Sequence, residues 1–176
     1  LPLLRAADLA PGAKALVVGA AGGVGGAVVP LLAARGVHVL ATAIPEDDDY
    51  LRGLGASETI DHRSSDVAAE TLRRHPDGVD ALLNLALPGA ALPALAHVVR
   101  PGGRLLNIAF PSPDPSTGFE TLHTLARPGD LDEVAALAVA GVLPSTVSRR
   151  YPPAEAARAY RDLVHGHVRG KLVVSG

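Results

Sequence analysis

Short apolar runs alternate with longer helical patterns along this chain, and this alternation limits the fold more than any other feature. We predict strands over 14–19, 37–43, 58–61, 79–85 and 104–110. We predict helices over 23–35, 46–54, 66–74 and 90–99. Strands separated by helices in this way form βαβ units, whose crossovers are right-handed. The pattern therefore predicts an α/β fold built on a doubly wound parallel sheet.

The remainder of the chain carries weaker signals. Residues 111–118 are rich in proline and serine, and we expect an irregular loop there. Residues 119–126 fit either a sixth strand or a helical turn, and a helix over 130–140 precedes a strand over 145–150. An amphipathic helix over 153–165 and a strand over 171–175 follow. We expect one domain over 1–150 and a short C-terminal helix-and-strand appendage over 151–176.

The predicted helix over 23–35 contains a proline. Proline has no amide hydrogen, and its ring crowds the preceding turn of a helix. We therefore expect Pro30 to kink or shorten this helix, which Gly36 should close at its C-terminal end.

A glycine-rich turn joins the first predicted strand to this helix. Its residues are Gly19-Ala20-Ala21-Gly22-Gly23-Val24-Gly25, so the fingerprint reads A-x-G-x-x-G, with Ala20 in place of the first glycine. Such a turn offers a pyrophosphate backbone amides and the positive end of a helix dipole. Gly22 would let the backbone approach the phosphates, and Gly25 would let the helix pack against the strand. A ligand-free turn is the alternative, but the position between first strand and first helix favours a Rossmann-type dinucleotide site.

Composition excludes several other classes of protein. The 176 residues are 48% hydrophobic with a net charge of −2, so the chain should be globular, with no basic surplus for nucleic acid. No apolar run reaches the roughly 20 residues of a membrane span, and no secretory signal is evident, so we expect a cytoplasmic location. The absence of cysteine rules out thiolate nucleophiles and thiolate zinc sites in this chain. Because residue 1 is not methionine, we expect the chain to be part of a longer or trimmed product.

No catalytic or metal motif stands out. The chain has no G-x-S-x-G, no H-E-x-x-H and no phosphate loop ending in Gly-Lys-Ser/Thr. His165 and His167 have ligand spacing but no third ligand in view, so we predict no metal site. We assign no catalytic residue, because hydride chemistry resides in a nicotinamide cofactor rather than in a protein nucleophile.

The glycine turn is part of a wider resemblance. GAAGGVG after PGAKALVV is similar to the turn of zinc-independent medium-chain dehydrogenases/reductases of the quinone-oxidoreductase type. The similarity continues, in the right order, through LRGLGASETIDHR, VDALLNLA, RPGGRLLNIA and HGHVRGKLVVSG. Such proteins usually bind NADPH and reduce quinones or activated enones by hydride transfer. The resemblance implies that this chain is the cofactor-binding portion, that the N-terminal catalytic domain is absent, and that residues 151–176 return to that domain.

The resemblance also implies where the cofactor contacts this chain. The contacts would come from the glycine turn, from the ends of the second to fifth strands, and from the C-terminal segment. The residues so implied are Ala21, Gly22, Gly23, Val24, Gly25, Thr42, Ala43, His62, Arg63, Leu85, Ala86, Ile108, Ala109 and Lys171. Arg169 belongs to the same C-terminal segment, where a solvated turn is the alternative. Asn84 and Asn107 also lie near strand ends, and we expect each to satisfy a local backbone group.

The choice between NADP(H) and NAD(H) depends on the end of the second strand. NAD-preferring enzymes place a carboxylate there on the ribose 2′-OH, whereas Ala43 makes no such bond and leaves room for a 2′-phosphate. The next residues, 46–49, are all acidic and include no lysine. We expect these carboxylates to face solvent in the first turn of a helix, which the helix dipole favours. With His62 and Arg63 near the phosphate we predict NADP(H), and NAD(H) is the alternative.

Three functional hypotheses stay open. In the first, the chain is the cofactor-binding part of an NAD(P)H-dependent oxidoreductase that acts on a small molecule such as a quinone, an enone or a similar carbonyl compound. In the second, it is a non-catalytic Rossmann module that binds a nucleotide. In the third, it is an enoyl-reductase domain of a multidomain synthase. A homodimer is compatible with each of them.

Overall fold

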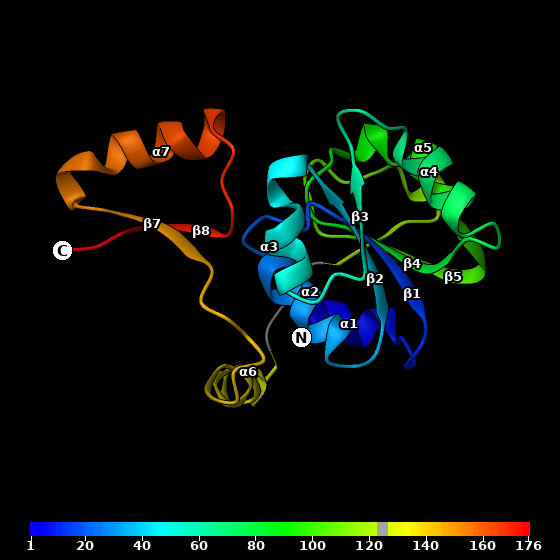
Figure 1. The fold of residues 1–176 in the computed structure, drawn as a ribbon, viewed down its shortest axis with the longest axis horizontal. Coiled ribbons are helices and arrows are strands. Elements are labelled where there is room, and N and C mark those ends of the chain that lie inside the picture. The colour runs from blue at the N-terminus through cyan, green and yellow to red at the C-terminus, as the bar shows by residue number, and fades with distance from the viewer. Residues whose placement is uncertain (123–126) are drawn as a thin grey trace.

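The computed structural model of the chain describes residues 1–122 and 127–176. Its centre is a six-stranded parallel sheet of order β3-β2-β1-β4-β5-β6 (Figure 1). The strands are β1 (Lys14–Val18), β2 (His38–Ala43), β3 (Glu58–Asp61), β4 (Val79–Asn84), β5 (Val99–Asn107) and β6 (Glu120–Thr121). The chain winds outward from β1 first in one direction and then in the other, which confirms the predicted doubly wound sheet.

Helices cover both faces of this sheet (Figure 1). They are α1 (Pro2–Ala7), α2 (Gly25–Ala33), the 3₁₀ turn η1 (Pro45–Asp47), α3 (Asp48–Gly53), α4 (Val67–Arg74), the 3₁₀ turn η2 (Gly89–Ala91) and α5 (Pro93–Ala96). Successive residues of a strand point to opposite faces. Ala15 and Val17 therefore pack with α1, α2 and α3, whereas Leu16 and Val18 pack with α4 and α5. Two apolar cores, one on each face, hold the sheet in place.

The predicted helix over 90–99 is wrong in its extent. The segment is divided between η2 and the four-residue helix α5, and β5 already begins at Val99 instead of residue 104. Pro93 stands in the first turn of α5, where its missing amide hydrogen costs nothing. The pairing of β4 with β5 is irregular between Val79 and Ala81, so that residues 101–103 stay within the strand. The predicted irregular loop 111–118 likewise contains a 3₁₀ turn, η3 (Pro115–Thr117).

Pro30 does not end the helix that contains it. The nine-residue helix α2 starts at Gly25, later than predicted, and continues past Pro30 to Ala33. The amide of Ala34 still donates to the carbonyl of Pro30 at 2.9 Å. The helix is shorter than the predicted 23–35, and the nitrogen of Pro30 donates no hydrogen bond within it.

The C-terminal elements form a layer of their own, beside the main sheet (Figure 1). After α6 (Asp130–Val139), the strands β7 (Val147–Tyr151) and β8 (Lys171–Val174) pair in parallel, and η4 (Pro153–Glu155) and α7 (Ala156–His165) connect them. The amide of Gly170 donates to the carbonyl of Ala21 at 2.8 Å and ties this layer to the glycine turn. The predicted helix-and-strand appendage is present, and its sheet also includes β7.

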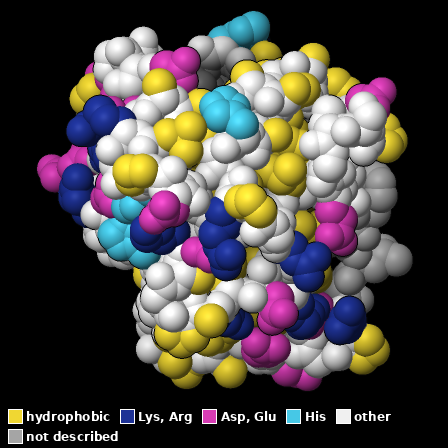
Figure 2. Space-filling view, turned by 90° about the vertical axis from the view of Figure 1, so that its right-hand side faces the viewer, with side chains coloured by type: hydrophobic (Ala, Val, Ile, Leu, Met, Phe, Trp, Pro, Cys, Tyr) yellow, Lys and Arg dark blue, Asp and Glu magenta, His cyan; other side chains and the backbone are white. Residues whose placement is uncertain are grey.

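Two further expectations concern the surface and the sixth strand. Figure 2 shows a face on which basic and acidic side chains are interspersed, in keeping with the net charge of −2. Within the described residues, no helix has both the length and the apolar character that a membrane crossing requires.

The segment 119–126 contains the short strand β6, and residues 123–126 lie outside the described residues.

Candidate functional site

A cleft of about 670 Å³ lies at the carboxyl ends of β1, β2 and β4. Gly19 follows β1, Ala43 ends β2 and Leu85 follows β4, and all three line the cleft. The C-terminal segment forms another part of the wall through Val168 and Lys171. In a doubly wound sheet, ligands bind at this edge, where the connections on either side of the first strand diverge. This cleft thus lies where the sheet topology predicts a ligand.

Most of the residues predicted from the sequence line this cleft. They are Ala21, Gly22, Gly23, Val24, Thr42, Ala43, His62, Leu85, Ala86 and Lys171. Gly25 lies beneath the turn, and Arg63 is exposed with its amide bound to Asp61 at 2.9 Å. Ile108 and Ala109 follow β5 beside the end of β4 and do not line the cleft. A cofactor contact by these four residues stays a prediction.

The glycine turn is tight, and its two key glycines differ in their surroundings. The amide of Gly22 donates to the carbonyl of Gly19 at 3.2 Å, and Gly19 has a φ of +83°. A Cβ added at Gly25 would overlap the backbone of Ala20, so Gly25 lets α2 approach β1 as predicted. A Cβ added at Gly22 would lie 3.4 Å from the carbonyl oxygen of Gly19, its nearest neighbour. Gly22 therefore has open space above it, on the side of the cleft.

Two features of this turn favour an anion. Among the described residues, the amide of Val24 at the start of α2 donates no hydrogen bond, as is usual for the first amides of a helix. The side chain of Lys171 lies directly over Gly23, where an added Cβ would overlap its outer carbons and its Nζ. Within the described part of the chain, Lys171 forms no ion pair with a carboxylate. A free ammonium group and the positive end of a helix dipole therefore face the same space.

The acidic run 46–49 is divided between the cleft and the surface. Asp47 is 1% exposed and lines the cleft, whereas Asp48 binds the guanidinium of Arg52 at 2.8 Å and the hydroxyl of Thr59. The expectation that these carboxylates face solvent is therefore wrong for Asp47. The other two, residues 46 and 49, are exposed as expected.

Two basic side chains of the C-terminal segment explain the burial of Asp47. Its Oδ2 lies 2.7 Å from Nε2 of His167, and its Oδ1 accepts from Nε of Arg169 at 2.6 Å. Arg169 also donates to the carbonyl of Glu46 and lies 5.8 Å over the ring of Tyr50. Burial raises the pKa of Tyr50, and the charge of Asp47 raises it further. Asp47 and the carbonyl of Glu46 thus hold Arg169 beside the cleft, with its side chain 42% exposed.

A buried pair of amides holds the turns that follow β4 and β5. Asn84 and Asn107 are both 0% exposed, and Nδ2 of Asn84 donates to Oδ1 of Asn107 at 2.7 Å. Asn84 also bonds the amide and the carbonyl of Leu87, at 2.9 and 2.8 Å. Nδ2 of Asn107 donates to the carbonyl of Ala109 at 3.0 Å. The predicted role of both side chains, satisfying local backbone groups, is confirmed.

Several lining residues were not predicted. Those with polar side chains are Asp47, Ser65 and His167. Ala91, Ala94 and Leu95 line the apolar end of the cleft. Their spacing is that of one helix face, so the sequence held a signal for them. No comparable signal existed for His167, because its partner Asp47 is 120 positions away in the sequence.

Most of the chain matches a known protein family. The pattern of the family described as zinc-binding dehydrogenase matches residues 54–174, more than half of the chain. The chain belongs to the zinc-binding dehydrogenase family. A mycocerosic acid synthase-like polyketide synthase of Mycobacterium tuberculosis is 34% identical over 190 residues, which cover 96% of this chain and 9% of that protein. A mitochondrial NAD(P)H oxidoreductase of Bos taurus is 25% identical, over 93% of this chain and 48% of that protein.

Solved structures of dehydrogenases and reductases have the same fold as this zinc-binding dehydrogenase family member. The quinone oxidoreductase from Coxiella burnetii has a TM-score of 0.89 at 24% identity, with 99% of this chain and 56% of that chain covered. The CurK enoyl reductase has a TM-score of 0.84 at 27% identity, with 98% and 57% covered. The expected relation to quinone-oxidoreductase-type medium-chain reductases is confirmed. The chain spans about half the length of these reductases and less than a tenth of the synthase.

Proposed function

We propose that this chain is the cofactor-binding part of an NAD(P)H-dependent oxidoreductase that transfers hydride to a quinone, an enone or a similar carbonyl compound. The observation that supports this most directly is the meeting of Gly22, the start of α2 and the Lys171 side chain at one end of the cleft. A pyrophosphate needs close backbone approach, amide donors and positive charge, and these groups supply all three. The residues present therefore fit a dinucleotide.

The bound cofactor would supply the hydride, and the chain's own residues would hold and shield it. Gly22, Gly23 and Val24 would bind the pyrophosphate, with Lys171 above them. The turn 85–87 and the exposed alanine face of η2 and α5 would cover the apolar portion and exclude water from it. Asn84 would keep that turn in position through its bonds to Leu87. Substrate-contacting residues would come from a domain outside this chain.

We propose a modest preference for NADPH, on the order of tenfold, or about 1.4 kcal/mol. Ala43 offers no carboxylate for a ribose 2′-OH. Asp47 is the carboxylate that lines the cleft, and its charge is already balanced by two basic partners. His62 lines the cleft, has an exposed side chain and can donate to a phosphate. A charge-assisted bond to phosphate contributes roughly 1.5–3 kcal/mol, enough to decide the preference.

The wider arrangement is also part of the proposal. We infer that residues 1–150 form the dinucleotide-binding domain, and that residues 151–176 return to a catalytic domain. A zinc ion held by thiolates of this chain would take no part in hydride transfer, because the sequence has no cysteine. A cytoplasmic location and a homodimer stay predictions.

A second candidate is an enoyl-reductase domain of a multidomain synthase. Three polyketide synthases are 34%, 33% and 31% identical over nearly the whole of this chain, which covers 9%, 9% and 3% of their lengths. The CurK structure, an enoyl reductase, adds a solved relative. The hydride chemistry would be the same, and the acceptor would be the double bond of an enoyl group. The two candidates differ in substrate and in neighbouring domains, not in the cleft described above.

Calorimetric titration of the chain with NADPH and with NADH tests the shared part of both candidates. We expect saturable binding of at least one nucleotide by the starting chain, and a large loss in Gly22→Val, whose branched side chain would occupy the pyrophosphate position. Unchanged affinity in Gly22→Val would mean that the site is assigned to the wrong place. Binding without turnover by the full-length protein, on quinones and on enoyl thioesters alike, would favour a non-catalytic nucleotide-binding module.

A further inference from the structure

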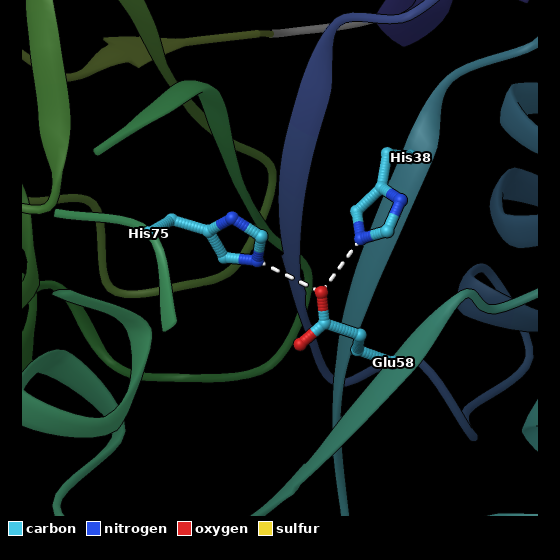
Figure 3. Close-up of side chains that lie close together, drawn as sticks. All are labelled: His38, Glu58 and His75. Atoms are coloured by element: carbon cyan, nitrogen blue, oxygen red, sulfur yellow. Dashed lines mark hydrogen bonds and ion pairs between the residues drawn. The ribbon is translucent and has the colours of Figure 1, made fainter. Parts of the chain in front are cut away.

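Three side chains that commonly bind metals meet at the edge of the sheet opposite the cleft (Figure 3). His38 begins β2, Glu58 begins β3 and His75 follows the last residue of α4. The amino ends of parallel strands lie at one edge of a sheet, and the cofactor cleft lies at the other. The cluster is therefore separate from the nucleotide site, and the proposed function does not depend on it.

The carboxylate of Glu58 is the centre of this cluster. Its Oε1 lies 2.6 Å from Nε2 of His38 and 2.8 Å from Nε2 of His75, as Figure 3 shows. Burial would raise the pKa of Glu58, but hydrogen bonds from His38, His75 and Arg74 outweigh it and lower the pKa to about 2. Two imidazole nitrogens and a carboxylate oxygen therefore share one small volume.

Neighbouring groups hold the three side chains in this arrangement. Arg74 binds Oε2 of Glu58 at 3.2 Å, which leaves Oε1 to face the two imidazoles. The same guanidinium donates to the carbonyl of Thr59 at 2.9 Å and pairs with Glu70 at 2.7 Å. Its positive charge opposes a second cation nearby, but Glu70 offsets part of that charge. The imidazole rings meet edge to face, with their centroids 5.6 Å apart.

We propose that His38, Glu58 and His75 form a binding site for a divalent transition-metal ion, with zinc as the ion that fits the ligand set best. Two imidazoles and one carboxylate are ligands that Zn²⁺ accepts, with bonds of about 2.0–2.2 Å. The chain supplies three ligands, and water would complete a four-coordinate ion. Metal binding would replace the hydrogens that the two rings now share with Glu58.

The present distances show what metal binding requires. Two ligands on a tetrahedral zinc ion lie about 3.3 Å apart, given bonds of about 2.0–2.1 Å. The nitrogen-to-oxygen distances of 2.6 and 2.8 Å must therefore lengthen by roughly 0.7 and 0.5 Å. The His38 side chain is 39% exposed, so its ring has room to move. Each neutral ring would carry its one hydrogen on Nδ1 and present the lone pair of Nε2 to the ion.

The sequence predicts no metal site because the three ligands do not form a motif of regular spacing. Glu58 is 20 residues from His38 and 17 from His75, and each ligand belongs to a different element. The two strands place the first two ligands on the same face of the sheet, since Leu40 pairs with Glu58 and His38 lies two residues before Leu40. The end of α4 brings the third. The site thus arises from the parallel packing of β2, β3 and α4.

Calorimetry with zinc chloride near neutral pH tests this proposal on the 176-residue chain. We expect one zinc ion per chain, no binding of magnesium, which prefers oxygen ligands, and a weakening of at least about tenfold in His75→Gln and in His38→Gln. The exposed His97, outside the cluster, gives the matched control His97→Gln, which should bind zinc as the starting chain does.

Circular dichroism of each variant ensures that a loss of zinc binding is not a loss of fold. The half-exposed His38 is the safer position, since its replacement leaves the core untouched. Cobalt substitution gives a second measurement, because its visible absorption reports the ligands around the ion. Zinc binding of equal strength in a folded His38→Gln variant, or no saturable binding by the starting chain, would overturn the proposal.

Discussion

The same added methyl group should have different effects at two glycines of the nucleotide turn: on stability at Gly25 and on nucleotide binding at Gly22. In Gly25→Ala, the new Cβ overlaps the carbonyl oxygen of Ala20 and comes within 2.6 Å of its Cα, and backbone atoms cannot rotate away. The helix α2 must then move off β1. In Gly22→Ala, the nearest atom to the new Cβ is the Gly19 carbonyl oxygen at 3.4 Å, an ordinary contact. The first change should damage the fold, and the second should damage the site.

The size of each effect follows from these contacts. Overpacking of this kind costs roughly 1–3 kcal/mol, which lowers the melting temperature of a chain of this size by roughly 2–4 °C for each kcal/mol. Gly22→Ala should change the free energy of unfolding by no more than about 0.5 kcal/mol. Displacing the phosphates from one charge-assisted hydrogen bond should cost about 1.5–3 kcal/mol of binding, or roughly 10- to 150-fold in Kd.

Thermal unfolding followed by circular dichroism and calorimetric titration with NADPH separate the two effects. We expect Gly25→Ala to melt several degrees lower than the starting chain, and Gly22→Ala to melt with it but to bind NADPH much more weakly. A folded Gly22→Ala protein with an unchanged Kd would refute the assignment of the pyrophosphate to this turn. A Gly25→Ala protein of unchanged stability would refute the packing argument.

Three other predictions address charge and completeness. Asp47→Asn should raise the preference for NADPH over NADH severalfold, because it releases Arg169 toward a phosphate. Asp48→Lys lies outside the cleft lining and should leave the ratio of the two Kd values unchanged. A gain in affinity for NADH in Asp47→Asn would contradict this. The purified chain alone should reduce quinones and enones little or not at all, and steady NADPH oxidation with either acceptor would show that the site is complete. The pKa of Glu58 is lowered from 4.5 to about 2 on folding, so its stabilising effect should be present above pH 4.5 and be lost as the pH falls toward 2. Glu58→Gln should flatten that part of the plot of unfolding free energy, measured in urea, against pH. An unchanged slope of this plot in Glu58→Gln would argue against the cluster.

The sheet and the glycine turn could be predicted because their signals are local. The strands β1, β2 and β4 are short, mostly apolar runs, and parallel order follows from the helices between the runs. The packing role of Gly25 follows from its spacing after β1. Boundaries were least certain where proline and glycine permit more than one conformation, as between η2 and β5.

The parts of the site that could not be predicted depend on pairs that are distant in the sequence. The acidic run 46–49 looks solvated when it is considered alone, since a helix dipole favours acids in a first turn. Asp47 is buried because His167 and Arg169, 120 and 122 positions later, reach it from the C-terminal segment. No local pattern contains that information, and the same holds for the meeting of His38 with His75.

The contact of the C-terminal segment with the glycine turn has a thermodynamic consequence. One wall of the cleft belongs to the main sheet and the other to the segment that contains Lys171, so a ligand in the cleft touches both. Any molecule that binds across two bodies favours their closed arrangement, and closure in turn tightens binding by the same factor. A nucleotide in this cleft would therefore slow proteolysis between α7 and β8.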